Sequence, residues 1–484
     1  MSISASLANA LSGLTAVARG AEVVSSNVSN ALTEGYGRRE IELGARLVAG
    51  NGAGVRVVGV TRAVDPYVLG ERRLADSELS YQETRAQFHQ ALQNIMGQPD
   101  DPSSLTGRLT NLDATLIEAA SRPDSVTRLD AASADAIALA NRLNFASDGI
   151  QDLRMEADQA IAVQVDRLNS GLAQVYELNT QIRSNAASGR QVNTLLDQRQ
   201  AIVDELSQIV PLKMAPREGG QVALYTPGGS ILLDGPPPTI TFAAAGVITP
   251  DMDVASGSLN NILINGTAVS GIDGGRLAGG TLGAAFHARD VAGVEAQSDL
   301  DAIASDLIER FADPAVDPTL LPGDPGLFTD AGAAFLVADE VGIAGRIQVN
   351  ALVDPAQGGA TWRMRDGLGA AVPGNVGDAT LLYALSDALT AGRVPASGAF
   401  SGASKSAAGL AGEYISKLNA QLVTAQGEQS FSLAQRDILK NIELQNGVDS
   451  DHEMQKLLLL EQAYAANAKV VSSADEMLQQ LLRL

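Results

Sequence analysis

The sequence is poor in the residues from which metal sites and disulfides are most often built. It has no cysteine, and its three histidines lie far apart at His89, His287 and His452. The missing cysteines exclude disulfides and thiolate ligands, and the scattered histidines argue against a zinc site. No apolar run reaches the roughly 18 residues that a transmembrane helix needs. We therefore expect no metal, no cofactor and no membrane partner.

Signatures of catalysis are also missing. The sequence has no Gly-x-Ser-x-Gly elbow, no His-Glu-x-x-His and no P-loop. The glycines of residues 50–54 lead into a valine-rich segment typical of a strand, whereas a dinucleotide loop opens a helix. Asp449, Asp451 and Glu453 lack the spacing and glycine of an EF-hand, and helix capping accounts for all three. We predict no catalytic residues and a protein that is not an enzyme.

Positive charge is scarce and unevenly placed. With 34 Lys and Arg against 56 Asp and Glu, the net charge is −22, which argues against nucleic-acid partners. Residues 1–50 are neutral and residues 447–484 carry −3, so the remaining −19 lies in residues 51–446. This distribution suits ends that pack on neighbours and a middle that faces water. The first charge is Arg19, so no cleaved signal peptide is expected.

The first thirty residues have the pattern of a pairing helix. Apolar residues recur at alternating spacings of four and three, which is the 3.5-residue period of coiled coils. The positions of this N-terminal seam are Ile3, Leu7, Ala10, Leu14, Val17, Ala21, Val24, Val28 and Ala31. We expect this seam to carry assembly contacts.

The last thirty residues repeat the pattern. The C-terminal seam consists of Leu457, Leu460, Tyr464, Asn467, Val471, Ala474, Leu478 and Leu481. Its polar member, Asn467, could fix the register of pairing. Upstream, Gly447 separates this helix from the preceding one, and Ser450 with Glu453 predicts a capping box. Each helix could be an ordinary amphipathic helix on a core, but the simplest partner of each is the other, or the same helices of neighbouring subunits.

Both ends resemble the bacterial flagellar rod, hook and hook-associated protein family. In "NVSNALTEGYGRREIEL" the family's turn motif is matched by Asn27, Asn30, Thr33, Gly35 and Tyr36, with Glu34 where proline is usual. The family's C-terminal motif is matched by Gly447, Val448, Glu453, Met454, Gln462, Ala463, Tyr464, Ala468, Asp475, Met477 and Leu478. The two motifs stand at opposite ends in the family's order. We expect Arg38 and Arg39, after the turn, to contact acidic groups of another subunit.

The middle of the chain predicts a mainly α protein with β-rich insertions. The terminal helices pair as a coiled coil, a long helical bundle follows, and β-rich domains lie outside. Leucine stripes such as Leu105–Leu116 indicate bundle helices, Pro123 marks a break between two helices, and Gly427 is expected to interrupt a late one. The predicted domains are the terminal assembly domain (1–50 and 447–484), the helical domain (51–210, 281–311 and 396–446), a β-rich outer domain (211–280) and a β-rich or mixed outer segment (312–395).

The helical middle resembles the hook-associated members of the family more than the hook protein, whose middle is β-rich. This resemblance implies a structural subunit at the junction of hook and filament, exported unfolded through the flagellar type III channel and located outside the cell. It implies a ring of copies of this chain. The implied partners are the hook protein, a second hook-associated protein and an export chaperone.

Three alternatives stay open at this point. The chain could be another axial subunit such as hook protein, which the long helical region 75–210 disfavours. It could be a secreted adhesin or enzyme that uses the flagellar export route, which a pocket in the β-rich region would favour. It could also be a cytoplasmic coiled-coil scaffold, which self-association without flagella would favour.

Overall fold

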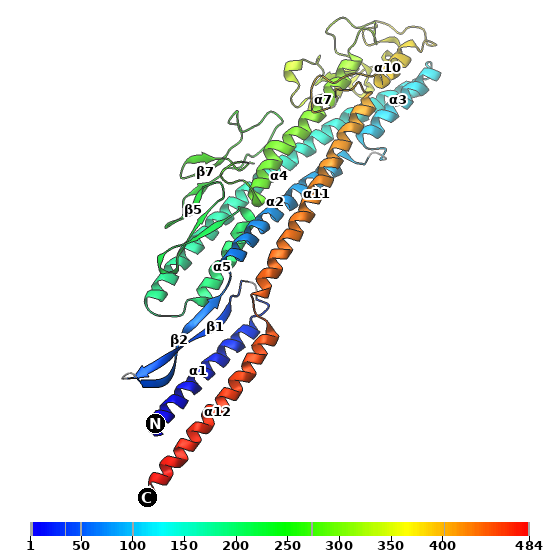
Figure 1. The fold of residues 1–484 in the computed structure, drawn as a ribbon. Helices are drawn as coiled ribbons and strands as arrows, with labels where there is room; N and C mark the ends of the chain where they lie inside the picture. The colour runs from blue at the N-terminus through cyan, green and yellow to red at the C-terminus, as the bar shows by residue number, and fades with distance from the viewer. Residues whose placement is uncertain are drawn as a thin grey trace. The chain divides into compact units, whose positions relative to one another are not determined.

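The computed structural model describes residues 3–33, 35–48, 51–98, 101–272, 274–400 and 402–482. The chain forms two compact units. Unit 1 consists of Met1–Leu79, Arg167–Pro238 and Ser432–Leu484, and unit 2 of Ser80–Asp166 and Thr239–Phe431. Most of the described residues are helical (Figure 1), which confirms the predicted fold class. In the described part of the chain, no helix has the length and apolar content to cross a membrane.

Unit 1 contains both ends of the chain. Its N-terminal part is α1 (Ile3–Ser29), the strands β1 (Arg38–Val48) and β2 (Asn51–Ala63), and the beginning of α2 (Pro66–Met96). The end of α4 (Val126–Ala187) and α5 (Asn193–Ile209) follow, with a small antiparallel sheet of β3 (Lys213–Pro216), β4 (Val222–Tyr225) and β5 (Ile231–Leu233). The end of α11 (Ala407–Gln445) and α12 (Ser450–Leu482) complete the unit.

The strands β1 and β2 form a long two-stranded hairpin. They pair antiparallel from Arg38↔Ala63 to Val48↔Asn51, with bulges near Glu42 and Ala45. The valine-rich segment after the glycines is therefore a strand, as predicted. The two strands lie on either side of the domain boundary predicted at residue 50, and they stabilise each other only as a pair.

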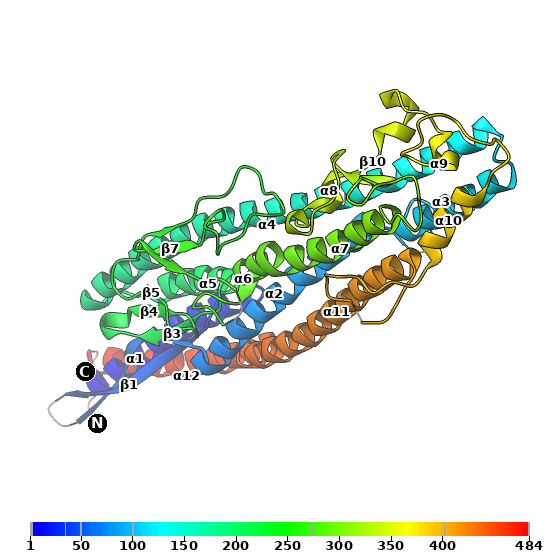
Figure 2. The same ribbon diagram turned by 90° about the horizontal axis from the view of Figure 1, so that it is seen from above.

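Unit 2 is an elongated helical layer with small irregular additions (Figure 2). Its helices are the remainder of α2, α4 and α11 together with α3 (Leu105–Ser121), α6 (Gly280–His287), α7 (Gly293–Phe311) and α10 (Thr380–Thr390). A π-helical turn, Ala288–Ala292, joins α6 to α7. A second small sheet contains β6 (Ile240–Thr241), β7 (Ile262–Ile264) and β8 (Thr267–Val269).

The core of unit 2 is built on the leucine stripes predicted from the sequence. Leu105, Leu109, Leu112 and Leu116 of α3 are all buried and belong to one continuous apolar cluster. Ser104 caps α3 by accepting a 3.1 Å hydrogen bond from the Gly107 amide. The break predicted at Pro123 is confirmed, because α3 ends at Ser121 and α4 begins at Val126. The period of the stripes was therefore sufficient to locate this bundle.

The segment 312–395 has much less β-structure than the sequence suggested. Its strands are only β9 (Phe328–Asp330) and β10 (Ile347–Val349), which pair with each other, and short helices α8 (Ile343–Arg346) and α9 (Arg363–Asp366) accompany them. The reason is that aspartate side chains compete with neighbouring strands for the backbone amides. The carboxylates of Asp313, Asp354 and Asp378 accept hydrogen bonds from backbone amides two residues further on. Such local bonds satisfy the backbone as turns and replace sheet ladders.

The expected interruption at Gly427 was wrong. The helix α11 continues through this residue from Ala407 to Gln445. One glycine inside a helix costs only about 1 kcal/mol relative to alanine, which the rest of a 39-residue helix readily offsets.

Candidate assembly site at the paired chain ends

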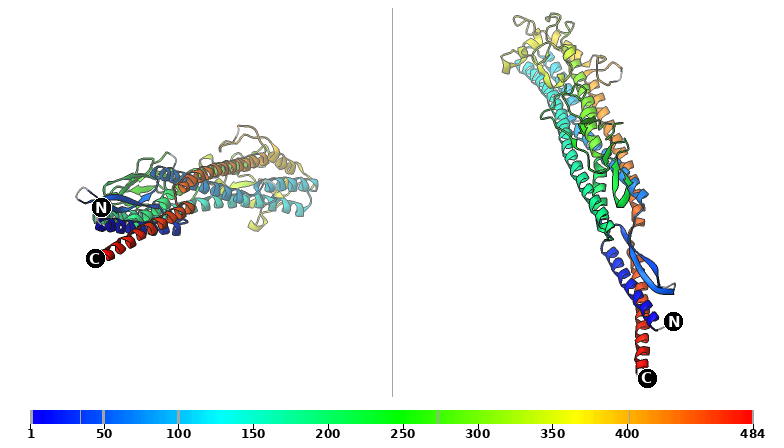
Figure 3. Two further views of the ribbon diagram at one scale, coloured as in Figure 1. Left: turned by 60° about the horizontal axis from the view of Figure 1, so that its bottom comes forward. Right: turned by 90° about the vertical axis from the view of Figure 1, so that its left-hand side faces the viewer.

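The first and last helices, α1 and α12, lie side by side and run antiparallel (Figures 1 and 3). Three residues of α1 at seven-residue spacing define the contact. A Cβ atom at Gly13 would lie 2.8 Å from the Asn467 side-chain oxygen, and one at Gly20 would lie 3.1 Å from Leu460. Asn27, the third, donates a 3.0 Å hydrogen bond to Glu453. The two glycines therefore allow α12 to approach closely where larger residues would not.

The N-terminal seam is only partly turned toward these contacts. Ala10 and Val24 are buried, whereas Ile3, Leu7, Leu14, Val17, Ala21 and Ala31 are half-buried and Val28 is exposed. Ala16 and Val23, each one position before a seam residue, are also buried. The offset arises because α1 also packs on the hairpin, where Ser12 accepts a 3.2 Å hydrogen bond from the Val55 amide. The role of the seam in assembly stays a prediction.

The C-terminal seam follows the observed contact more closely along its first five turns. Leu457, Leu460, Asn467 and Val471 are half-buried and Ala474 is buried, although Tyr464 is 50% exposed. Leu478 and Leu481 are exposed. In the antiparallel register that places Gly13 against Asn467, Leu481 lies beyond Ile3, where α1 begins. The end of α12 therefore presents apolar side chains that the described residues do not cover.

Asn27 is the centre of the site and is fully buried. Its amide nitrogen donates to the Arg39 carbonyl at 2.9 Å and to a carboxylate oxygen of Glu453 at 3.0 Å. Its amide oxygen accepts from the Arg39 backbone N–H at 2.8 Å and from the Tyr36 hydroxyl at 3.0 Å. All four hydrogen bonds available to an asparagine side chain are thus made. One side chain joins α1, the turn, β1 and α12.

The remaining motif residues shape the turn between α1 and β1. Asn30 donates a 2.9 Å hydrogen bond to the Ser26 carbonyl, and its own carbonyl accepts from the Thr33 amide. The Tyr36 amide donates to the Thr33 carbonyl, and Gly35 has a positive φ of 75°. Glycine is suited to that backbone conformation. The structure therefore brings all five motif residues together, while Glu34 lies outside the described residues.

Asp197 on α5 fixes the strands that follow the turn. It forms ion pairs with Arg39 and, at 2.7 Å, with Arg62, and it accepts a 3.1 Å hydrogen bond from the Gly37 amide. Arg38 pairs with Glu40 at 2.7 Å. Both arginines therefore have acidic partners within the same chain. Their contact with another subunit stays a prediction. Asp197 was missed because the sequence places it 158 residues from Arg39.

The beginning of α12 differs from the predicted capping box. The cap is Asp449, whose carboxylate accepts hydrogen bonds from the Asp451 amide at 2.9 Å and the His452 amide at 3.1 Å. Ser450 is already the first residue of the helix. Glu453 is buried and accepts from Asn27 and from Lys456 instead of reaching back to the cap. The third acidic residue of "DSDHE" therefore serves the contact between the chain ends.

A second group of charges in unit 1 is centred on the buried Arg72. Arg72 contacts Asp76 at 2.5 Å, Asp204 at 2.7 Å and Glu443 at 2.7 Å, which joins α2, α5 and α11. Burial lowers the pKa of Arg72, but these three carboxylates outweigh it and the pKa is raised. Burial raises the pKa of Asp76 despite its arginine partner. The protonated form of Arg72 is thus stabilised by its three carboxylate partners.

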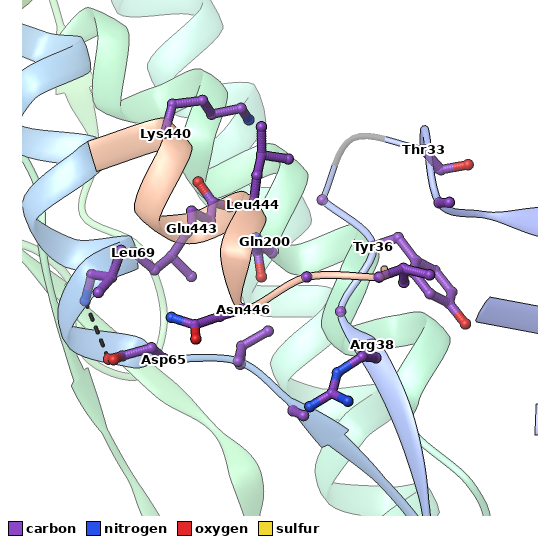
Figure 4. Close-up of a pocket in the computed structure, with 18 of the residues that line it drawn as sticks. Thr33, Tyr36, Arg38, Asp65, Leu69, Gln200, Lys440, Glu443, Leu444 and Asn446 are labelled. Carbon is purple, nitrogen blue, oxygen red and sulfur yellow. Dashed lines mark hydrogen bonds between the residues drawn. The ribbon is translucent and has the colours of Figure 1, made fainter. Parts of the chain in front are cut away.

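A small pocket lies beside the turn (Figure 4). Its volume is about 260 Å³. Residues from the turn, α2 and the end of α11 line it, among them Tyr36, Leu69, Lys440 and Leu444. It contains no pairing of a nucleophile with a base, and in the described part of the chain no three His, Asp or Glu residues are placed to hold a metal ion.

Paired terminal helices, a buried motif asparagine and a helical middle are the features of a structural protein. Two family models match the chain: "Flagellar hook-associated protein FlgK helical domain" over residues 89–324, and "Flagellar basal body rod FlgEFG protein C-terminal" over residues 445–484. The chain belongs to the flagellar hook-associated protein 1 family.

Proteins named flagellar hook-associated protein 1 in several bacteria are similar to this chain. Flagellar hook-associated protein 1 of Bacillus subtilis is 25% identical over 98% of this chain and 97% of its own length. That of Salmonella typhimurium is 30% identical over 47% of this chain, and the match spans 42% of the Salmonella protein. A flagellar hook junction protein from Burkholderia pseudomallei aligns over 54% of this chain and 47% of its own, with 23% identity and a TM-score of 0.46.

Proposed function

We propose that the chain is the structural subunit that joins hook and filament in the bacterial flagellum, without enzymatic activity. The observation that carries the proposal is the pairing of α1 with α12 through Asn27 and Glu453, one residue from each family motif. Because each end depends on the other, a subunit of this kind completes its assembly surface only when both ends are in place. The family membership of the chain supports the same role.

Apolar side chains at the chain ends are exposed, which supports the proposal that assembly buries them. Leu11 is 60% exposed on α1, and Leu459 is 65% exposed on α12. Helices with uncovered apolar faces are only marginally stable in water and gain most of their stability from packing. Copies of this chain, the hook protein and a second hook-associated protein are the partners that would cover them. Transport in an unfolded state through the flagellar export channel, with a chaperone, would precede this step.

Immunogold electron microscopy on detached flagella tests the proposal. Antibody against residues 239–431 of unit 2 should give one cluster of label at the boundary between hook and filament. Label along the whole hook or filament would make the chain a bulk axial subunit, and the junction role would be wrong. Absence of label from intact flagella would reject a flagellar structural role and favour the adhesin, enzyme or scaffold alternatives.

A further inference from the structure

The pocket beside the turn is enclosed by parts of unit 1 that are far apart in the sequence. The turn and the start of β1 contribute residues 31–33 and 35–38, α2 contributes Leu69, and the end of α11 contributes Leu444. Figure 4 shows Tyr36, Leu69 and Leu444 around the same cavity. We call this cavity the turn pocket. Its lining is one continuous surface, and every lining residue belongs to unit 1.

Three apolar side chains that line the turn pocket are exposed to water. Leu32 is 99% exposed, Leu444 is 58% exposed and Val64 is 39% exposed. Tyr67, three residues after Val64, is 74% exposed. Single exposed apolar residues are ordinary, whereas several around one cavity are typical of a surface that contacts another protein. The described part of the chain therefore leaves the rim of the turn pocket uncovered.

Leu32 is held in water by an ordered turn. On one side of it, the Thr33 amide donates a 2.9 Å hydrogen bond to the Asn30 carbonyl, and the Asn30 side chain donates at 2.9 Å to the Ser26 carbonyl. On the other side, the Tyr36 amide donates at 3.2 Å to the Thr33 carbonyl. The backbone that carries the leucine is thus fixed before any contact is made. Such pre-organisation lowers the entropy that is lost when a side chain docks.

The turn pocket has the size of a side chain. Its volume is about 260 Å³, below the roughly 300–1,000 Å³ that is typical of small-molecule sites. Val68 and Val448 add apolar wall to Leu69 and Leu444. Leu32 of the same chain does not fill the cavity, because a leucine seated there would not be 99% exposed. An apolar side chain from outside would be removed from water there together with part of the rim.

We propose that Leu32 of one copy of this chain inserts into the turn pocket of the neighbouring copy, an interface that rests on the proposed function. Copies in a ring are related by rotation, so two surfaces that touch must lie at the same height along the ring axis. Leu32 and the turn pocket meet this condition for any direction of the axis, because Ala31 and Thr33 beside Leu32 line the pocket. The leucine and the cavity are different surfaces, so the contact is head-to-tail, as in rings.

Disulfide crosslinking tests the contact, since the chain has no cysteine of its own. Leu32→Cys is produced in the flagellated host together with a second chain that carries Leu444→Cys or Val64→Cys, and detached flagella are oxidised. Because a disulfide needs Cα atoms within about 7 Å, at least one of the two mixtures should give a covalent dimer on a non-reducing gel. No single variant alone should do so. The matched control pairs Leu32→Cys with Val247→Cys, a valine of unit 2 that is 66% exposed, and should give no dimer.

A charge at Leu32 gives a second and independent measurement. Leu32→Asp should not change the thermal unfolding or the secreted amount of the chain, because the side chain is already in water. It should reduce boundary label at least about tenfold, which corresponds to about 1.4 kcal/mol, because a carboxylate would have to enter an apolar cavity. Leu32→Met and the matched control Val247→Asp should both label as the wild type does.

The outcomes separate the interface from the proposed function. Normal label with Leu32→Asp would overturn the interface. Loss of label with Leu32→Asp, but no mixed dimer in normally labelled cysteine variants, would overturn a second copy as the occupant. Dimers from Leu32→Cys alone would mean that two turns meet each other, which also overturns insertion into the pocket. Absence of boundary label in the wild type is a separate result, because it rejects the proposed function itself.

Discussion

At the residue scale, Asn27 holds the chain ends together because no other side chain supplies two donors and two acceptors in that shape. We expect Asn27→Ala to destabilise unit 1 by roughly 3 kcal/mol, since it leaves one buried carboxylate oxygen of Glu453 and two backbone groups of Arg39 without partners. Hydrogen exchange of α1 and α12 amides should show the loss. Unit 2 should be unaffected.

A matched variant separates the hydrogen bonds from the charge. Glu453→Gln keeps an oxygen that can accept from Asn27 and gives up the 3.0 Å contact with Lys456. Glu453→Gln should therefore lower the free energy of unfolding of unit 1 less than Asn27→Ala does. Equal losses for the two variants would mean that the buried charge of Glu453, and not the Asn27 hydrogen bonds, stabilises the contact.

His89 makes unit 2 sensitive to acid. It is 4% exposed, and burial, together with the positive charges of Arg85 and His287, lowers its pKa from 6.5 to about 4. The neutral form is therefore favoured in the folded state, and this contribution to stability is complete above pH 6.5 and lost as the pH falls toward 4. Thermal unfolding of wild type and His89→Leu should diverge across this window, with the wild type losing more stability. Parallel pH curves would contradict the assignment.

At the scale of elements, α1 and α12 are predictable from periodicity, whereas the face that each presents is not. The 3.5-residue pattern located both helices, but it counted apolar residues and so passed over Gly13 and Gly20, where the contact is closest. The sequence did contain a signal for this contact, which is the seven-residue spacing of Gly13, Gly20 and Asn27. The ion pairs of Asp197 are tertiary contacts between distant parts of the sequence, so a local pattern does not predict them. The continuity of α11 through Gly427 depends on the rest of the helix, which the glycine alone does not indicate.

Glycine substitutions test whether α1 packs closely on α12 at Gly13. Gly→Ala inside a helix normally adds about 1 kcal/mol of stability. Gly427 has open space around it, so Gly427→Ala should show that gain. At Gly13 the new methyl group would lie 2.8 Å from Asn467, so Gly13→Ala should show no gain or a loss. The free energy of unfolding of the two single variants is the measurement, and equal gains would reject close packing of α1 on α12.

At the scale of the whole molecule, we expect unit 2 to supply stability and unit 1 to supply the assembly surface. The apolar cluster that runs from Phe88 to Leu418 lies within unit 2, so this unit has a core of its own. In unit 1, α12 has only Glu453 and Ala474 buried along Ser450–Leu482. A helix so little covered relies on partners for its stability. Opening of the chain ends should therefore leave unit 2 intact.

This division predicts what an aspartate in the terminal helices should do. Leu478→Asp and Val17→Asp each place a charge on an apolar surface that assembly is expected to cover, and burying an unpaired charge costs several kcal/mol. Both variants should be secreted and should unfold in unit 2 at the wild-type temperature, yet leave the hook–filament boundary unlabelled. In assembled wild-type flagella, α12 amides should exchange more slowly than in the free subunit, while unit 2 amides exchange equally. A lowered unfolding temperature of unit 2, or normal label in both variants, would mean that the terminal helices serve the fold of the subunit and not its assembly.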